Sequence, residues 1–436
     1  MSRTADAIII GAGVIGAAVA FEMAKKGFKT LNIDANGEAG HGSTAASCAV
    51  IRVHYSTLEG TALAYEAYHY WRNWGEYLEI RDERGLAEFL ELGCLVMKTD
   101  QNDHMKKQTQ ICEQLGVVYE DWDEAAIRAR LPGCRLDRFS PAKRPEDVGF
   151  GEPTGGKLEG AIFFPNAGYV NDPALSTHNL QRAAEAKGAE FLFNSTVTEI
   201  LRTATGTTGV RLASGEKLSS PVVINVAGPA SNKINQMADV TGDMSIRTQA
   251  MKQEVVHVPM PEGYFADGSK FLISDSDTFL YCRPEKSDHL LIGSEDPSCD
   301  DHVWVDDPEG DDWRDFTEQS RIQAMRMAQR VPTIGIPNYP RGVVGLYDVA
   351  DDWIPIYDRS SLPGFYMACG TSGNQYKNAP MAGKMMAALV EYCEGGNDHD
   401  SRPLTIRMPY TGIDLDIGFF SRKRPVNQDS SFSVLG

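Results

Sequence analysis

Three glycines and one acidic residue near the start of the chain have the spacing of a site that binds phosphate and ribose. The glycines stand at positions 11, 13 and 16, and Asp34 follows about twenty positions further on. Glycines so spaced permit a tight turn, a close approach of the backbone to a pyrophosphate and close packing of a helix on a strand. An acidic side chain at that separation accepts hydrogen bonds from a ribose. The pattern predicts a dinucleotide site, and a strand-to-helix turn that binds nothing is the alternative.

The elements expected around these residues agree with such a site. Residues 7–10 form an apolar run typical of a buried parallel strand, and residues 30–34 form a second strand. A helix is expected over residues 14–26, with its first N–H groups directed at the phosphates. It ends at Gly27, a residue type that commonly terminates helices.

Further along the chain, strand and helix patterns alternate, and two kinds of sheet are interleaved. Buried strands are expected over 221–228 and 364–370, whereas residues 250–294 alternate apolar and polar side chains as in an antiparallel sheet with one open face. Helices are expected over 58–79, 103–115, 123–130, 172–187, 310–330 and 379–391. This order predicts an α/β protein in which an antiparallel-sheet domain is inserted into a discontinuous nucleotide-binding domain. A polar tail after residue 424 is expected to cross the surface as a strap.

The composition excludes several classes of protein. The net charge of −18 argues against a nucleic-acid surface, which needs clustered lysine and arginine. No apolar stretch reaches the roughly 20 residues of a membrane helix, so no transmembrane segment is expected. The first strand begins too early to leave room for a secretory signal, and the eight cysteines show no paired spacing, which together predict a cytoplasmic protein. The nine histidines show no metal-binding spacing, so no structural metal is expected.

Five stretches outside the 11–16 loop carry more specific motifs. They are Gly-Ser-Thr-Ala-Ala-Ser-Cys-Ala-Val-Ile-Arg at 42–52, Phe-Pro-Asn-Ala-Gly-Tyr-Val at 164–170, Val-Ala-Gly at 226–228, Gly-Leu-Tyr-Asp-Val-Ala-Asp-Asp-Trp-Ile-Pro at 345–355 and Gly-Thr-Ser-Gly-Asn-Gln-Tyr-Lys at 370–377. In this order they resemble the flavoprotein family of D-amino acid oxidase, sarcosine oxidase and dimethylglycine dehydrogenase, over nearly the whole chain. The resemblance implies FAD rather than NAD, which the glycines alone leave open. At 350–351 the chain has Ala-Asp where the family usually has Thr-Pro, so this turn departs from the family pattern.

The resemblance also implies an architecture and a set of cofactor-binding residues. The fold would be a discontinuous Rossmann-like FAD-binding domain of the glutathione-reductase type, over residues 1–85, 150–235 and 340–436. The inserted antiparallel-sheet domain, over residues 86–149 and 236–339, would bind the substrate. The expected cofactor-binding residues are Gly11, Gly13, Val14, Ile15, Gly16, Asp34, Ala35, Gly42, Ser43, Thr44, Ser47, Cys48, Ala49, Val197, Ala227, Gly228, Gly345, Gly370, Ser372, Gly373, Asn374, Gln375, Tyr376 and Lys377.

Two cations and one tyrosine are the residues that the resemblance assigns to the substrate. Family substrates are amino acids or N-alkyl amino acids, and Arg52 and Lys377 match positions that would hold the substrate carboxylate. A surface or interdomain salt bridge is the alternative for each cation. Tyr281 is expected to line the pocket. No catalytic base is assigned, because a neutral amine can lose its proton to solvent.

The implied reaction is FAD-dependent oxidation of the C–N bond of a small carboxylate-bearing amine, a secondary or N-methylated amino acid such as sarcosine, dimethylglycine or a proline-like acid. FAD is expected to be non-covalent, because Ala46 and Gly345 stand where some relatives carry the linking histidine or cysteine. Leu291 replaces a lysine of monomeric sarcosine oxidases, which favours a dehydrogenase, passing electrons to a protein or quinone, over an oxidase. The alternative function is a flavin-binding assembly or interaction protein of the same fold.

Overall fold

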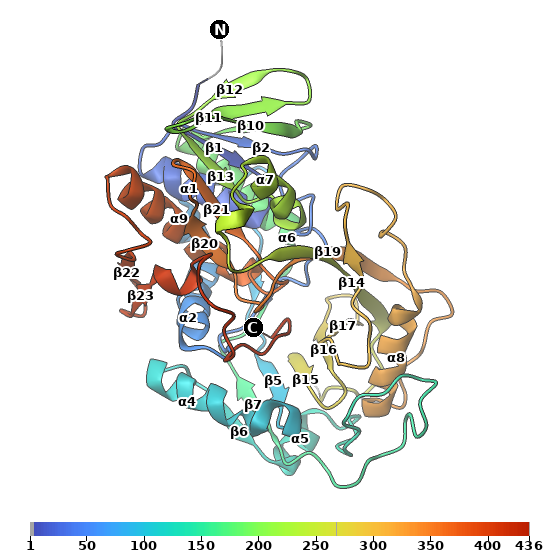
Figure 1. Ribbon diagram of the computed structural model, residues 1–436. Coiled ribbons are helices and arrows are strands. Elements are labelled where there is room, and N and C mark those ends of the chain that lie inside the picture. The colour runs from blue at the N-terminus through green and yellow to red at the C-terminus, as the bar shows by residue number, and fades with distance from the viewer. Residues whose placement is uncertain (1–3, 267, 436) are drawn as a thin grey trace.

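Two sheets organise the computed structural model, which describes residues 4–266 and 268–435 (Figure 1). The first is a six-stranded sheet in the order β20-β21-β13-β1-β2-β9. Its strands are β1 (Ala7–Ile10), β2 (Thr30–Ile33), β9 (Glu190–Leu192), β13 (Val222–Asn225), β20 (Ile356–Arg359) and β21 (Phe365–Cys369). All neighbours are parallel except β20 and β21. The parallel strands expected from the buried apolar runs are therefore confirmed.

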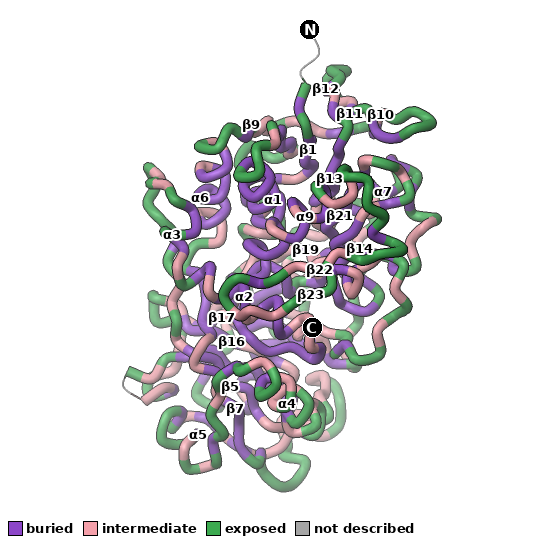
Figure 2. The backbone as a smooth tube through the Cα atoms, turned by 90° about the vertical axis from the view of Figure 1, so that its left-hand side faces the viewer, coloured by how far each residue is buried: buried purple, intermediate pink, exposed green. Residues whose placement is uncertain are grey.

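Helices cover one face of this sheet, and a small antiparallel sheet covers the other. Because strand side chains alternate between faces, Ala7 and Ile9 pack in one core cluster with α1 (Val14–Lys25), whereas Ile8 and Ile10 pack in another with the small sheet. The strands of the small sheet are β10 (Val197–Thr203), β11 (Gly206–Leu212) and β12 (Lys217–Ser219). On the helical face, α1 packs against both α6 (Pro173–Ala186) and α9 (Ala379–Glu394) (Figure 2).

A nine-stranded, mostly antiparallel sheet forms the second unit (Figure 1). Its order is β18-β14-β17-β16-β15-β5-β7-β6, and β19 pairs with β14 as well. The strands are β5 (Cys94–Met97), β6 (Glu120–Trp122), β7 (Ala161–Phe164), β14 (Thr248–Pro259), β15 (Leu272–Asp275), β16 (Leu280–Pro284), β17 (His289–Ser294), β18 (Trp304–Val305) and β19 (Gly342–Ala350). Helix α8 (Glu318–Arg330) packs on β14, β16 and β17. The predicted antiparallel character of residues 250–294 is confirmed.

The remaining elements connect and flank these two units. They are α2 (Leu58–Arg72), α3 (Trp74–Leu78), α4 (Lys106–Leu115), α5 (Glu124–Arg130), α7 (Ser231–Met237), the 3₁₀ helices η1 (Asp100–Met105), η2 (Gly228–Ala230), η3 (Thr241–Asp243), η4 (Tyr376–Asn378) and η5 (Ile417–Phe420), and the strands β3 (Val50–Ile51), β4 (Phe89–Leu90), β8 (Gly168–Val170), β22 (Thr405–Arg407) and β23 (Asp414–Asp416). Among the helices of the described chain, none is long and apolar enough to cross a membrane.

Four elements depart from the expected pattern. Strands β7 and β19 pair within the nine-stranded sheet, although residues 150–235 and 340–436 were assigned to the nucleotide-binding domain. The helix expected over 58–79 is interrupted at Asn73, which has the non-helical torsions φ −111° and ψ 38°. The helix expected over 310–330 begins only at Glu318, because Thr317 caps it by accepting a hydrogen bond from the N–H group of Gln319.

Candidate functional site

The loop between β1 and α1 has room for glycine alone at two positions. Gly11 has φ +112°, and a Cβ atom there would lie 2.4 Å from the carbonyl oxygen of Val226. A Cβ atom at Gly16 would lie 2.0 Å from the carbonyl oxygen of Gly11. At Gly13 a Cβ atom would lie 3.2 Å from Oγ1 of Thr44, so the 11–16 loop and the 42–52 segment face each other closely. Helix α1 begins at this loop, so its first N–H groups lie where the 11–16 loop meets the 42–52 segment.

Asp34 supports the same loop from the end of β2. Its Oδ2 atom accepts a hydrogen bond from the N–H group of Ala12 at 2.7 Å, and its Oδ1 atom accepts one from the N–H group of Asn36 at 2.8 Å. The side chain is half-buried, and the next residue, Ala35, is exposed. The structure thus places Asp34 where it shapes the loop, and its contact with a ribose stays a prediction.

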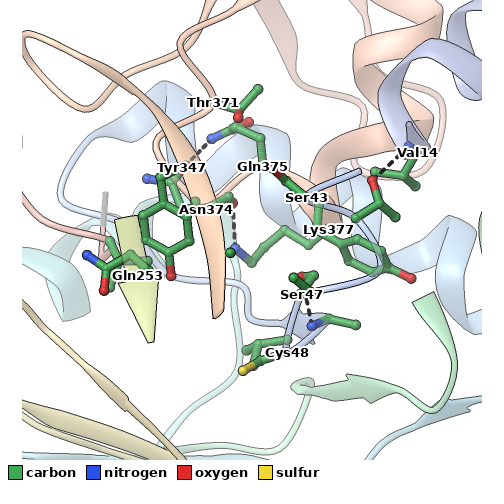
Figure 3. Close-up of a pocket in the computed structure, with 18 of the residues that line it drawn as sticks. Val14, Ser43, Ser47, Cys48, Gln253, Tyr347, Thr371, Asn374, Gln375 and Lys377 are labelled. Atoms are coloured by element: carbon green, nitrogen blue, oxygen red, sulfur yellow. Dashed lines mark hydrogen bonds between the residues drawn. The ribbon is translucent and has the colours of Figure 1, made fainter. Parts of the chain in front are cut away.

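A large cavity opens between the two sheets (Figure 3). The empty volume of this cavity is about 1500 Å³, and part of that volume is open to solvent. The 11–16 loop, the 42–52 segment and the 370–377 turn form its nucleotide side, and β14, β15, β16 and β19 form the opposite side. Val14 marks the first of these segments in Figure 3, where its N–H group donates to Oγ1 of Thr44 at 3.1 Å.

Most of the predicted site residues line this cavity. Those that do are Gly13, Val14, Ile15, Gly16, Ser43, Thr44, Ser47, Cys48, Ala49, Arg52, Gly228, Tyr281, Gly345, Gly373, Asn374, Gln375, Tyr376 and Lys377.

Eight predicted cofactor residues do not line the cavity. They are Gly11, Asp34, Ala35, Gly42, Val197, Ala227, Gly370 and Ser372. Two of them hold the wall from behind instead, because Gly370 donates its N–H group to Asp348 at 2.6 Å and Ser372 donates its hydroxyl to Gly370 at 3.1 Å. Val197 is buried in the core beneath the small antiparallel sheet, so its side chain is engaged in packing.

The two predicted cations converge on one tyrosine. The guanidinium carbon of Arg52 lies 4.1 Å from the centre of the Tyr55 ring, and Nζ of Lys377 lies 3.0 Å from the Tyr55 hydroxyl. Nζ of Lys377 also donates to the carbonyl oxygen of Asn374 at 2.6 Å (Figure 3). Both side chains are buried and line the cavity, which excludes a surface salt bridge for either.

The guanidinium of Arg52 donates to backbone carbonyl groups. Its Nη1 atom donates to His54 at 2.5 Å, and its Nη2 atom donates to Val434 at 3.0 Å and also to Leu435. The last two residues belong to the polar tail, which was expected on the surface. The tail does cross the molecule, but its end lies against the cavity.

The environment of the cavity disfavours the protonated forms of Lys377 and His54. Burial, followed by the charge of Arg52, holds the pKa of Lys377 well below its usual value. The same two causes, with a further contribution from Lys377, hold the pKa of His54 well below its usual value. An anion between Arg52 and Lys377 would relieve this repulsion, so the site favours a negatively charged group.

Strands β15, β16 and β17 turn one face towards the cavity. Ser274, Tyr281 and Gly293 lie opposite one another across these strands, so they share that face. A Cβ atom at Gly293 would lie 2.2 Å from the Tyr281 ring, which shows that the ring lies over β17. The Tyr281 hydroxyl is 3.6 Å from Sγ of Cys48, and burial raises its pKa well above the usual value. Tyr281 therefore offers a neutral hydroxyl to the cavity.

Sequence reasoning missed several residues of the cavity wall. They include Ser274, Gln253, Tyr347, Asp348, Val434 and Leu435. Burial raises the pKa of Asp348 to about 7. Asp348 belongs to the 345–355 motif, in which the family resemblance points to Gly345 alone as a cofactor-binding residue. Val434 and Leu435 carried no signal, because nothing in a short polar tail points to a partner elsewhere in the chain.

Comparison with known proteins identifies the family. A family model described as FAD dependent oxidoreductase, DAO, matches residues 6–389. The chain belongs to this family. Among curated relatives, the DAO-family chain is 23% identical over 432 residues to monomeric sarcosine oxidase from Bacillus sp. (strain B-0618), covering 94% of this chain and 97% of that one. It is 22% identical over 401 residues to sarcosine oxidase subunit beta from Rhizobium meliloti (strain 1021), covering 88% of this chain and 84% of that one.

Solved structures share the fold of this DAO-family chain. L-proline dehydrogenase from P. horikoshii superposes with a TM-score of 0.73 at 19% identity, covering 97% of this chain and 98% of that one. Glycine oxidase from Geobacillus kaustophilus superposes with a TM-score of 0.71 at 19% identity, covering 92% of this chain and 98% of that one. The predicted family and fold class are confirmed.

FAD is the cofactor of this DAO-family enzyme, and the cavity fits it. Residues 13–16 line the cavity where α1 begins, and the first N–H groups of that helix suit a pyrophosphate. From there the cavity continues without interruption to the 370–377 turn and the face of β16. We expect the 11–16 loop and the 42–52 segment to hold the phosphates, and the 370–377 turn to cover the flavin ring.

Proposed function

We propose that this enzyme oxidises the C–N bond of a secondary or N-methylated amino acid and holds the carboxylate of that substrate between Arg52 and Lys377. The observation that carries the proposal is the convergence of these two buried cations on Tyr55. An arginine fork binds a carboxylate in a bidentate manner, and a lysine adds a point charge. Burial and the charge of Arg52 hold the pKa of Lys377 well below its usual value, and an anionic ligand between the two side chains would offset this repulsion.

The names of the relatives support this substrate class. Sarcosine oxidase and L-proline dehydrogenase are named for amino acids with secondary amines, and glycine oxidase is named for one with a primary amine. All three names denote small amino acids, and the two cations of the present site suit the acid group that these molecules share.

The side chains of the site would bind and orient the substrate, while FAD supplies the redox chemistry. A carboxylate at Arg52 and Lys377 would fix one end of the substrate, and Ser274 of β15 and Tyr281 of β16 would border the other. The bound carboxylate would also raise the pKa of Lys377 towards its usual value, because it replaces repulsion by attraction. Proton loss from the amine needs no base from the chain.

We propose that the electron acceptor is a protein or a quinone rather than oxygen. Leu291 of β17 lies opposite Arg283 of β16, on the sheet face that carries Tyr281. A leucine at this position provides no charge to stabilise the negative charge that develops on oxygen. Oxygen uptake during turnover tests this part: uptake as fast as substrate consumption contradicts it, and turnover that needs an added quinone or dye supports it.

Anaerobic mixing with a panel of amines tests the substrate class. The panel contains sarcosine, dimethylglycine, L- and D-proline and D-alanine, and the flavin absorbance is recorded. We expect at least one secondary or N-methylated acid to bleach the flavin, and the matching amine without the carboxylate, dimethylamine or pyrrolidine, to fail. Equal bleaching by the amine without its carboxylate, or no bleaching by any acid, would contradict the proposal.

A further inference from the structure

The C-terminal segment is anchored on the protein body up to residue 429. Arg424 makes two hydrogen bonds to the buried carboxylate of Asp352, at 2.8 and 2.9 Å. The N–H group of Asn427 donates to the same carboxylate at 3.3 Å, and Lys107 pairs with Asp429 at 2.9 Å. These contacts fix the path of the chain as it approaches the cavity, and its described end lies between the two sheets (Figure 1).

Beyond this anchor, residues 431–435 are attached to the body mainly through Arg52. Their other hydrogen bonds stay local in the described chain: Phe432 donates to Ser430, Leu435 donates to Ser433, and the hydroxyls of Ser431 and Ser433 pair with each other. The bonds that leave the segment run from Nη2 of Arg52 to the carbonyl groups of Val434 and Leu435.

Apolar packing adds a second attachment. The Val434 side chain packs against the small cluster of Met251, Val349 and Trp353. Val434 and Leu435 both line the cavity, so the segment forms part of its wall. A short segment held by one side chain and one valine is held weakly enough to exchange with a ligand.

The segment and a substrate would compete for the same N–H groups. A carboxylate carries a full negative charge and two oxygens that match the arginine fork, so it binds a guanidinium more strongly than a carbonyl group does. The carbonyl groups of residues 434 and 435 are neutral, so a carboxylate that reaches Arg52 would replace them at Nη2.

We propose that the segment Ser431–Leu435 forms a wall of the active site that the substrate displaces. The segment binds Arg52 when no substrate is present and leaves it when an acid binds. This inference rests on the proposed function, because it takes Arg52 as the carboxylate anchor. The segment then contributes to substrate selection, because its occupation of Arg52 lowers the apparent affinity of every acid that must displace it.

Hydrogen exchange of the FAD-loaded full chain tests the displacement. The probes are acetate and cyclopentanecarboxylate, acids without an amine to oxidise, and their binding is followed by the flavin spectrum. We expect exchange of the amides of residues 431–435 to rise at saturating acid while residues 424–429 stay unchanged. Arg52→Met should raise the same exchange without any acid, because the attachment itself is lost.

Two matched valine substitutions test the competition. Val434→Gly removes the packing of the segment and should tighten acid binding by about fivefold, because the segment then occupies Arg52 in a smaller fraction of the molecules. Val426→Gly, in the anchored and exposed part of the tail, should leave acid binding unchanged.

The outcomes separate the two proposals. An acid that perturbs the flavin spectrum while exchange of residues 431–435 stays constant overturns the displacement and leaves the proposed function standing. Unchanged acid affinity in Val434→Gly does the same. If neither acid binds the wild type or the Val434→Gly variant, both proposals fail together.

Discussion

At the scale of single residues, Tyr55 contacts both Arg52 and Lys377 and stabilises the two basic side chains next to each other in a buried site. Its ring faces the guanidinium of Arg52, and its hydroxyl accepts a hydrogen bond from Lys377. The face of an aromatic ring attracts a cation, and this attraction increases when water is excluded. The hydroxyl also donates to the carbonyl oxygen of Asn374 at 2.7 Å, which ties the tyrosine to the 370–377 turn. Tyr55 therefore connects an early segment of the chain with a late one.

Replacing Arg52 tests its role as the carboxylate anchor. Arg52→Met should lower kcat/KM by about 10- to 150-fold, since losing a charge-assisted hydrogen bond costs roughly 1.5–3 kcal/mol of transition-state stabilisation. Arg52→Lys keeps the charge without the fork and should fall between wild type and Arg52→Met. Steady-state kinetics on the best acid of the panel measure this. FAD content should be unchanged in both variants, and unchanged kinetics would show that Arg52 only supports the fold.

The attachment of FAD is a second question at this scale. Ala46 and Gly345, the positions at which some relatives link the flavin, are neighbours in the cavity: a Cβ atom at Gly345 would lie 2.9 Å from Cβ of Ala46. Neither carries a nucleophile, so acid precipitation should leave all of the FAD in the supernatant. A yellow pellet would contradict this. Repeating the precipitation with Cys48→Ala would then show whether the one cysteine of the 42–52 segment is responsible.

At the scale of elements, the packing of α1 against α9 decides where the 11–16 loop lies. A Cβ atom at Gly383 of α9 would lie 2.6 Å from the carbonyl oxygen of Ala18 in α1. No flexible side chain is involved, so one backbone would have to move. Because α1 begins at the 11–16 loop, any displacement of α1 would also move the N–H groups that face the cavity.

We therefore expect Gly383→Ala to destabilise the protein by about 1–3 kcal/mol and to lower its FAD content. The loss should exceed the gain of up to about 1 kcal/mol that alanine brings to a helix. Gly75→Ala in α3 is the matched control, because its Cβ atom would meet only the end of the Leu86 side chain, at 3.3 Å. Urea unfolding measures both. Equal stability of the two variants would show that α1 and α9 can separate without loss.

Sequence patterns indicated most elements correctly, and their failures have local causes. The helix over 58–79 is continuous in apolar periodicity, yet it breaks at Asn73, whose side chain donates to the carbonyl oxygen of His69 at 2.9 Å. An asparagine that bonds to the nearby backbone competes with the helix, and apolar periodicity does not register that competition.

At the scale of the whole molecule, the sequence predicted the two kinds of sheet but not how the chain is shared between them. Strand β19 is followed directly by β20 of the nucleotide unit, yet it pairs over nine residues with β14. Strand pairing depends on partners far away in sequence, so no local pattern shows it. The same limit hid Val434, whose partner Arg52 is separated from it by most of the chain.

Buried carboxyl groups around the cavity give the molecule a specific pH dependence. Burial raises the pKa of Glu295 to about 7, although Ser274 and Ser276 donate hydrogen bonds to it at 2.5 and 2.8 Å. The native state therefore holds a proton on Glu295 between about pH 4.5 and 7 that the unfolded chain has lost. This group stabilises the native state fully below about pH 4.5, and the stability is lost as the pH rises through 7.

Glu295→Gln should remove this pH dependence, because glutamine is neutral at every pH and can still bond to both serines. At pH 8.5 the variant should exceed the wild type in free energy of unfolding by up to roughly 3 kcal/mol, whereas at pH 4.5 the two should be equal. Urea unfolding of the FAD-loaded protein at both pH values measures the difference. Glu216→Gln, at an exposed carboxylate on the small antiparallel sheet unit, is the control and should match the wild type at both. A Glu295→Gln variant that is less stable at pH 8.5 would mean that the ionised carboxylate is favoured in the fold, and that Arg52 rather than burial dominates its environment.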